Sequence, residues 1–140
     1  MTFLQPPGHV HAMTWATRQP FGVEIRSNGS AACGVPGVDF SAQASESGDT
    51  VVVRLLNANA VSTAHYSLDV ALRGGGGRGR LAVRARTIGG VADLTASNTP
   101  ARPNAIVPRL LPLPGDRMPV PIALPANSYT VVTVTRQQPA

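Results

Sequence analysis

Lysine is missing from the sequence: all 12 basic residues are arginine, and the formal net charge is +5. The arginines are spread along the chain, so we attribute them to a GC-rich coding bias and expect no nucleic-acid partner. The single cysteine, Cys33, excludes an internal disulfide bond and a cysteine-based metal site. Aromatic residues make up only 4% of the chain, which disfavours a module that stacks sugars on a flat aromatic platform. No apolar run approaches the roughly 18 residues of a membrane-spanning helix, so we expect no membrane contact.

The residues that could carry site chemistry favour neither a metal ion nor a cofactor. His9 and His11 are two residues apart, a spacing that puts them on different faces of a helix and prevents joint binding of one ion. The seven acidic residues lie in turns or on the polar side of alternating segments, where solvated charge is their ordinary role. RGGGGRGR, residues 73–80, resembles an RNA-binding RGG segment but has no interleaved aromatic residue. We expect it to be a lengthened hairpin loop.

One modification site and the compartment are open questions at this level. Asn28-Gly29-Ser30 matches the N-glycosylation pattern, which makes Asn28 a candidate only in a eukaryotic secretory pathway. The opening residues MTFLQPPG have neither the basic region nor the apolar region of a signal peptide. We therefore assign no compartment, and expect an extracellular location if the source is eukaryotic.

The first 20 residues predict one short helix. Pro6 and Pro7 suit the first helical turn, where an N–H group has no intrahelical partner, and residues 8–17 contain no further helix breaker. The helix should end before Gln19, because a residue that precedes proline avoids the α conformation. Within the helix, Val10, Met13 and Thr17 fall on one face.

From Phe21 onward the hydrophobic pattern alternates, which predicts β-strands. Between Ser97 and Pro125 lie eight of the 13 prolines, so we expect that segment to cross the surface in an irregular, extended conformation. The fold class is therefore all-β: an antiparallel β-sandwich, jelly-roll-like or immunoglobulin-like, preceded by one short helix. The predicted strands are FGVEIRS (21–27), TVVVRLLNA (50–58), AHYSLDVAL (64–72), RLAVRART (80–87) and SYTVVTVT (128–135). The alternation predicts a core that includes Tyr66, Leu68, Val70, Leu81, Val83 and Val131.

Three stretches together resemble the C-terminal region of α-L-arabinofuranosidases of glycoside hydrolase family 51. LQPPGHVHAM (4–13) looks like the loop and helix that follow the last strand of that family's catalytic (β/α)8 barrel. LTASNTPARPNAIVP (94–108) and LPANSYTVVTV (124–134) are similar to two segments of the family's β-sandwich. The resemblance covers most of the chain, but the glycine run and the proline-rich stretch 108–125 depart from the family pattern.

The resemblance implies a role for Gln5. Active sites of such barrels lie at the C-terminal ends of their strands, so a residue just after the last strand faces the substrate. In the family, a glutamine at this place hydrogen-bonds the bound arabinose, and Gln5 is the matching residue. The alternative is that Gln5 only caps the helix that follows it.

The resemblance also implies which parts of the enzyme are absent. The family hydrolyses terminal non-reducing α-L-arabinofuranosyl residues with retention, using two glutamates of the barrel, and its Asn-Glu acid/base signature is missing here. We therefore expect no catalytic residue in this chain and no activity of the chain alone. The alternative function is a free-standing, non-catalytic β-sandwich that binds carbohydrate or protein.

The expected organisation follows from these assignments. Residues 1–20 would be the last loop and helix of the barrel, residues 21–136 the C-terminal β-sandwich, and residues 137–140 a tail. The sandwich would pack on a catalytic barrel, and the substrate, an arabinose-containing polysaccharide or glycoside of hemicellulose or arabinan, would bind through that barrel. The exact substrate and the oligomeric state are left open.

Overall fold

The computed structural model describes residues 3–27, 30–31, 37–72, 80–91 and 93–137. No helix in this part of the chain has the length and apolar character needed to cross a membrane. Within the described ranges, the elements in chain order are α1 (Pro6–Ala16), β1 (Phe21–Gly22), β2 (Arg26–Ser27), β3 (Ser30–Ala31), β4 (Val38–Ala44), β5 (Thr50–Asn57), β6 (Ala64–Leu68), β7 (Leu81–Gly89), β8 (Arg109–Leu110), β9 (Val120–Leu124) and β10 (Ser128–Arg136).

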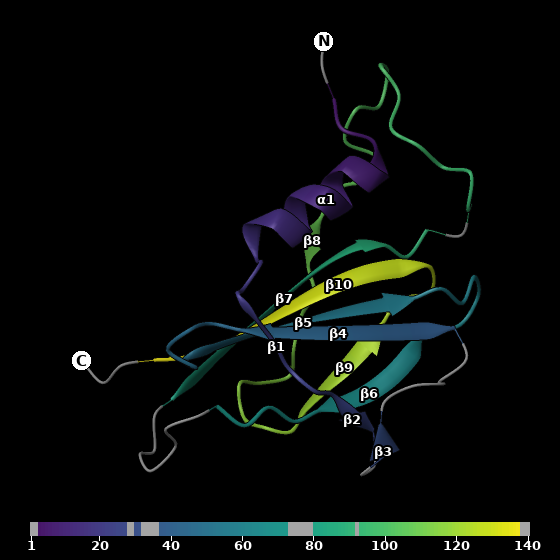
Figure 1. The fold of residues 1–140 in the computed structure, drawn as a ribbon. Coiled ribbons are helices and arrows are strands. Elements are labelled where there is room, and N and C mark those ends of the chain that lie inside the picture. Colours follow the sequence, from purple (N-terminus) through teal and green to yellow (C-terminus); the bar gives the residue numbers. More distant parts are fainter. Residues whose placement is uncertain (1–2, 28–29, 32–36, 73–79, 92, 138–140) are drawn as a thin grey trace.

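The centre of the fold is an antiparallel six-stranded sheet in the order β1-β4-β5-β10-β7-β8 (Figure 1). Strand β10 pairs with β5 from Ser128 to Thr135 and with β7 from Ser128 to Arg136. The last strand of the chain is thus inserted between two strands that precede it by tens of residues. Strands β6 and β9 form a separate two-stranded sheet, and β2 pairs with β3.

The β6–β9 pair packs against one face of the six-stranded sheet and encloses the main core. This arrangement of two antiparallel layers confirms the all-β sandwich with one N-terminal helix. The buried residues of this core are Ala42, Val51, Val53, Leu55, Ala85, Val120, Ile122, Leu124, Val132 and Val134. Five of the residues predicted for the core, all except Val131, are half-buried at its rim: Tyr66, Leu68, Val70, Leu81 and Val83.

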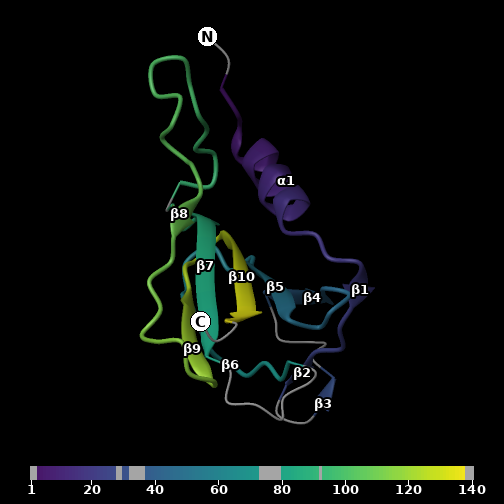
Figure 2. The ribbon, with the colours of Figure 1, turned by 90° about the vertical axis from the view of Figure 1, so that its left-hand side faces the viewer.

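Helix α1 covers the opposite face of the same sheet, as the edge-on view shows (Figure 2). A second apolar cluster lies beneath it, formed by Met13, Val52, Ile88, Ile106 and Val131. Val131 is thus buried as predicted, but against the helix and not inside the sandwich. The two prolines open the helix at its first two positions, and the helix ends at Ala16, before Gln19.

Several local predictions were wrong. The segment 64–72 does not form a hairpin with 80–87, because β6 pairs with β9 while β7 pairs with β10 and β8. The inward alternation of 64–72 is correct, but alternation alone does not select the partner strand. The glycine run between these segments, with its RGG-like arginines at 73 and 78, lies outside the described residues.

Two further differences concern strand boundaries. FGVEIRS is not continuous: β1 and β2 are interrupted at residues 23–25, and Val23 is exposed. The sequence analysis predicted no strand where β4 lies, because this segment has few large apolar residues. The proline-rich crossing contains a paired strand, β9, in which Pro121 is exposed while Val120 and Ile122 are buried. Proline is tolerated there because β9 is a short strand with a single partner within the described sheets.

We predict that the sandwich core tolerates truncation poorly. Leu124→Ala should lower the free energy of unfolding by about 2–5 kcal/mol, because Leu124 is 0% exposed and its loss leaves a cavity. Leu110→Ala is the matched control, since Leu110 is 74% exposed, and should change stability by less than about 0.5 kcal/mol. Urea unfolding curves measure both. Equal effects of the two substitutions would contradict the assigned core.

Candidate functional site

Gln5 occupies the position immediately before helix α1. Its backbone is extended, with φ −75° and ψ 159°, and its carbonyl accepts the first hydrogen bond of the helix from His9 at 3.2 Å. Its side chain forms no capping hydrogen bond with the helix. Gln5 is therefore the N-cap residue through its backbone and not through its side chain.

The side-chain amide of Gln5 is instead hydrogen-bonded to the main chain of Asn98, a residue 93 positions away. Gln5 Nε2 donates to the Asn98 carbonyl at 2.9 Å, and the Asn98 main-chain N–H donates to Gln5 Oε1 at 3.2 Å. A primary amide has two N–H groups and two acceptor lone pairs. One N–H and one lone pair of this exposed side chain thus have no partner among the described residues.

Asn98 itself is 2% exposed and connects two segments with its side chain. Its Nδ2 donates to the carbonyls of Leu4 at 2.7 Å and Ile106 at 2.9 Å, and its Oδ1 accepts from the main-chain N–H of Ile106 at 2.8 Å. A buried amide that is satisfied in this way stabilises a single arrangement of the segments it joins. The loop before α1 is therefore attached to the 94–108 segment of the sandwich.

Further along the helix, polar contacts fasten α1 to the sheet. The hydroxyl groups of Thr14 and Tyr129 are 2.8 Å apart. The guanidinium of Arg54, from the middle of β5, donates to Gln43 Oε1 at 2.8 Å and to the Thr17 carbonyl at 3.2 Å. Arg54 is only 8% exposed, and a cation near the carbonyl end of a helix is electrostatically favourable. The helix is thus held at both ends, by Asn98 near its start and by Arg54 near its end.

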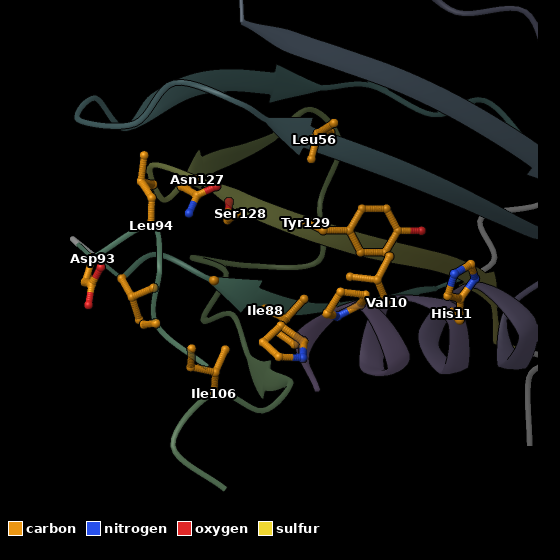
Figure 3. A pocket seen from close by; sticks show the side chains of 15 residues that line it. Val10, His11, Leu56, Ile88, Asp93, Leu94, Ile106, Asn127, Ser128 and Tyr129 are labelled. Carbon is orange, nitrogen blue, oxygen red and sulfur yellow. The ribbon is translucent and has the colours of Figure 1, made fainter. Parts of the chain in front are cut away.

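A cavity of about 390 Å³ lies between the start of α1 and the neighbouring ends of β7 and β10 (Figure 3). Val10 and His11 reach it from the helix, Tyr129 from β10, and Leu94 from the loop after β7. The walls are mostly apolar. Gln5 is not part of the lining, although the adjacent Pro6 and Pro7 are.

The cavity lacks the groups needed for glycoside hydrolysis. Among the described residues, Asp93 is the single acid that lines it. Hydrogen bonds from the hydroxyl and then from the main-chain N–H of Thr95 lower the pKa of this exposed carboxyl below its ordinary value, a direction opposite to that needed by a general acid. A retaining mechanism needs two carboxyl groups about 5 Å apart. The cavity can hold an apolar group but cannot carry out this reaction.

The other residues singled out in the sequence do not join a site. His11 lines the cavity, whereas His9 does not. The described part of the chain contains no group of three side chains that could together bind a metal ion. Asn28, the candidate glycosylation site, lies outside the described residues.

Asn98 and Arg54 were missed as individual residues by the sequence analysis. Asn98 lies in the stretch 94–108 that carries the family resemblance, but its type alone does not distinguish a buried amide from a turn residue. The signal for Arg54 was available: a single charged residue interrupts an apolar run that predicts a buried strand. A charge at such a position requires hydrogen-bond partners.

Comparison with solved structures gives a clear result for the fold, whereas no protein-family model and no curated protein matches the sequence. The glycoside hydrolase family 51 arabinofuranosidase of Xanthomonas axonopodis pv. citri superposes with a TM-score of 0.70 at 24% identity, over 95% of this chain and 27% of that chain. The arabinose-bound MgGH51 α-L-arabinofuranosidase superposes with a TM-score of 0.68 at 18% identity, over 96% of this chain and 20% of that chain. A family 51 α-L-arabinofuranosidase of Bifidobacterium longum superposes with a TM-score of 0.68 at 20% identity, over 94% of this chain and 26% of that chain.

These comparisons confirm the predicted resemblance at the level of the fold. Nearly the whole chain has the fold of one portion of these glycoside hydrolases. The chain spans only 20–27% of the length of the three enzymes. Most of each enzyme therefore has no counterpart in these 140 residues.

We predict that Arg54 is needed for attachment of the helix. Arg54→Lys should lower the free energy of unfolding by about 1–3 kcal/mol, because a single ammonium group cannot reach Gln43 and Thr17 with the geometry of the guanidinium fork. The same substitution at the exposed Arg84 is the control and should have little effect. Thermal and urea unfolding measure both. A variant as stable as the wild type would show that these hydrogen bonds contribute nothing to docking of α1.

Proposed function

We propose that this chain is the C-terminal β-sandwich portion of a retaining α-L-arabinofuranosidase that removes terminal non-reducing α-L-arabinofuranosyl residues from hemicellulose or arabinan. The observation that carries the proposal is the match of 94–96% of the chain to family 51 arabinofuranosidases. Residues 1–20 belong to the last loop and helix of the catalytic barrel, and residues 21–136 form the sandwich. The sandwich packs on that barrel.

The catalytic barrel and this chain have different roles in the reaction. One glutamate of the barrel protonates the glycosidic oxygen, and a second attacks the anomeric carbon to form a glycosyl-enzyme that water then hydrolyses. Neither glutamate belongs to this chain, whose Glu24 and Glu46 occur in different sequence contexts from the Asn-Glu signature. The chain contributes binding and positioning, not proton transfer or nucleophilic attack.

Gln5 is the residue of this chain that contacts the sugar. Its free N–H and its free lone pair suit a sugar hydroxyl, which both donates and accepts hydrogen bonds. Its exposed position at the start of a helix that follows a barrel strand supports the same role. The similar MgGH51 structure was determined with arabinose bound.

The outer surface of α1 supports packing on a further domain. Between Pro6 and Ala16 the sequence contains no Asp, Glu, Lys or Arg. Its sheet-facing side carries Met13, whereas Trp15 is 69% exposed and is covered only in part by the guanidinium of Arg18, which lies 4.0 Å from its ring centroid. A helix without charged side chains that exposes a tryptophan on its outer side suits a position between two packed layers.

We predict that the purified chain alone releases no arabinose from an aryl α-L-arabinofuranoside above the buffer rate, because both catalytic carboxylates are missing. A colorimetric assay with the chain at micromolar concentration measures this. Turnover that follows the protein through a second purification step and disappears in Glu24→Gln would contradict the proposal. Binding of carbohydrate without turnover would favour a free-standing binding module.

We further predict that Gln5 contributes to catalysis once a barrel is supplied. In a chimera that joins this chain to the unmatched part of the Xanthomonas enzyme, Gln5→Ala should lower kcat/KM by roughly threefold to a hundredfold. The melting temperature should fall modestly as well, because the substitution also removes the two hydrogen bonds to the main chain of the buried Asn98. Gln137→Ala is the control, since Gln137 is also an exposed glutamine. Unchanged kcat/KM with a lower melting temperature would show that Gln5 has a structural role only.

A further inference from the structure

We propose that Asn98 is a positioning residue: from within the sandwich it fixes the orientation of Gln5 and of the loop that carries it. The proposal rests on the proposed sugar contact of Gln5 and extends it to a residue that touches no substrate. It assigns to the sandwich a direct part in shaping the pocket of a neighbouring catalytic domain.

The first argument is the number of attachments that one residue supplies. The Asn98 side chain holds the main chain of Leu4, and the Asn98 main chain holds both polar atoms of the Gln5 side chain. Two successive residues of the loop are thus bonded to the same partner. The backbone and the side chain of Gln5 cannot reorient independently of Asn98.

The second argument is that Asn98 is itself immobilised. It is 2% exposed, and its side chain bonds both polar main-chain groups of Ile106. Ile106 belongs to the apolar cluster beneath α1. The anchor is therefore part of the packed interior, whereas the group that it orients is exposed.

The third argument concerns the cost of ordering Gln5. An exposed glutamine samples several rotamers, and a ligand that selects one of them must offset the lost conformational entropy. The paired bonds to Asn98 select one rotamer before any ligand binds. The remaining N–H and lone pair then have fixed directions, as a preorganised binding group requires.

Asparagine is required at this position by the chemistry of its partners. Both N–H groups of the Asn98 side chain point to carbonyl oxygens, those of Leu4 and Ile106. Aspartate has nearly the same shape but would oppose these two carbonyls with an oxygen that cannot donate when ionised. Asn98→Asp therefore removes the donors while it changes the volume very little.

The native chain provides the first test. In ¹⁵N-labelled protein, the side-chain amide of Gln5 should show a heteronuclear NOE close to that of the backbone amides of β10, although Gln5 is exposed. The side-chain amide of Gln137, also exposed, is the reference for a mobile glutamine. A Gln5 amide as mobile as that of Gln137 would overturn the proposal without any substitution.

Substitutions provide the second test. Asn98→Asp keeps the main-chain groups that bond Gln5 but loses the side-chain donors to Leu4 and Ile106 that fix residue 98 and the loop. The Gln5 amide should therefore become mobile, while the backbone amide of Val132 in β10 keeps its protection from hydrogen exchange. Asn104→Asp is the matched control, because Asn104 lies in the same segment and is exposed, and it should leave the Gln5 amide ordered. An ordered Gln5 amide in a folded Asn98→Asp variant would show that Asn98 has no positioning role.

Activity of the chimera separates the two proposals. Asn98→Asp should lower kcat/KM by no more than Gln5→Ala does, and the double variant should be no worse than Gln5→Ala alone, because both act through one group. If the fold-losses in kcat/KM of the two single variants multiply in the double variant, Asn98 acts independently of Gln5, through stability alone, and the positioning role is overturned. If Gln5→Ala has no effect, the sugar contact fails, even where the NMR result upholds the bonds between Asn98 and Gln5.

Discussion

Burial of the six-stranded sheet on both faces is the constraint on which the remaining structure depends. In β5, residues 51–55 are all buried, and β10 is buried over most of its length. Strand β5 is accordingly an almost continuous apolar run that only Arg54 interrupts, and β10 is rich in β-branched valine and threonine. A different part of the chain packs on each face of the sheet. The β6–β9 pair buries the face that forms the sandwich core, and α1 with the loop around Ile106 buries the opposite face.

The polar residues within this covered sheet determine how the helix is attached. Apolar packing alone would allow α1 to slide or rotate, because hydrophobic contacts have no direction. Arg54, Tyr129 and Asn98 add directional bonds at three points along the helix and the loop before it. Leaving a buried donor unpaired is costly, so each bond disfavours alternative placements more than it contributes to net stability. The covered face thereby gives Gln5 a defined place relative to the sandwich.

The sequence predicted the parts of this fold that depend on local signals. Proline placement marked the start of α1, β-branched runs marked β5 and β10, and alternation gave the inward residues of β6 and β7. Partner choice failed, because the pairing of β6 with β9 joins segments more than 50 positions apart and the glycine run suggested a nearer partner. For the candidate site, the family resemblance pointed to Gln5, whose sugar contact stays a prediction, but no local pattern indicates that its amide bonds residue 98. Arg54 could have been recognised as a charge in a buried strand.

The described residues position a loop, but they provide no pair of catalytic groups. The described carboxylates form no catalytic pair in the cavity, and hydrogen bonds from Thr95 lower the pKa of the one that lines it. The structure instead places Asn98, a buried amide whose side-chain nitrogen and oxygen are both bonded, beside a short exposed loop. Such groups are expensive to maintain in an interior, because each must be matched in direction and in donor or acceptor type. A helix cap or a turn would need only one of these bonds, and the side chain of Gln5 makes no cap. In the proposed function, orientation of this loop for contact with a group outside this chain accounts for the bonds of Asn98 and for their placement at the junction between helix and sandwich.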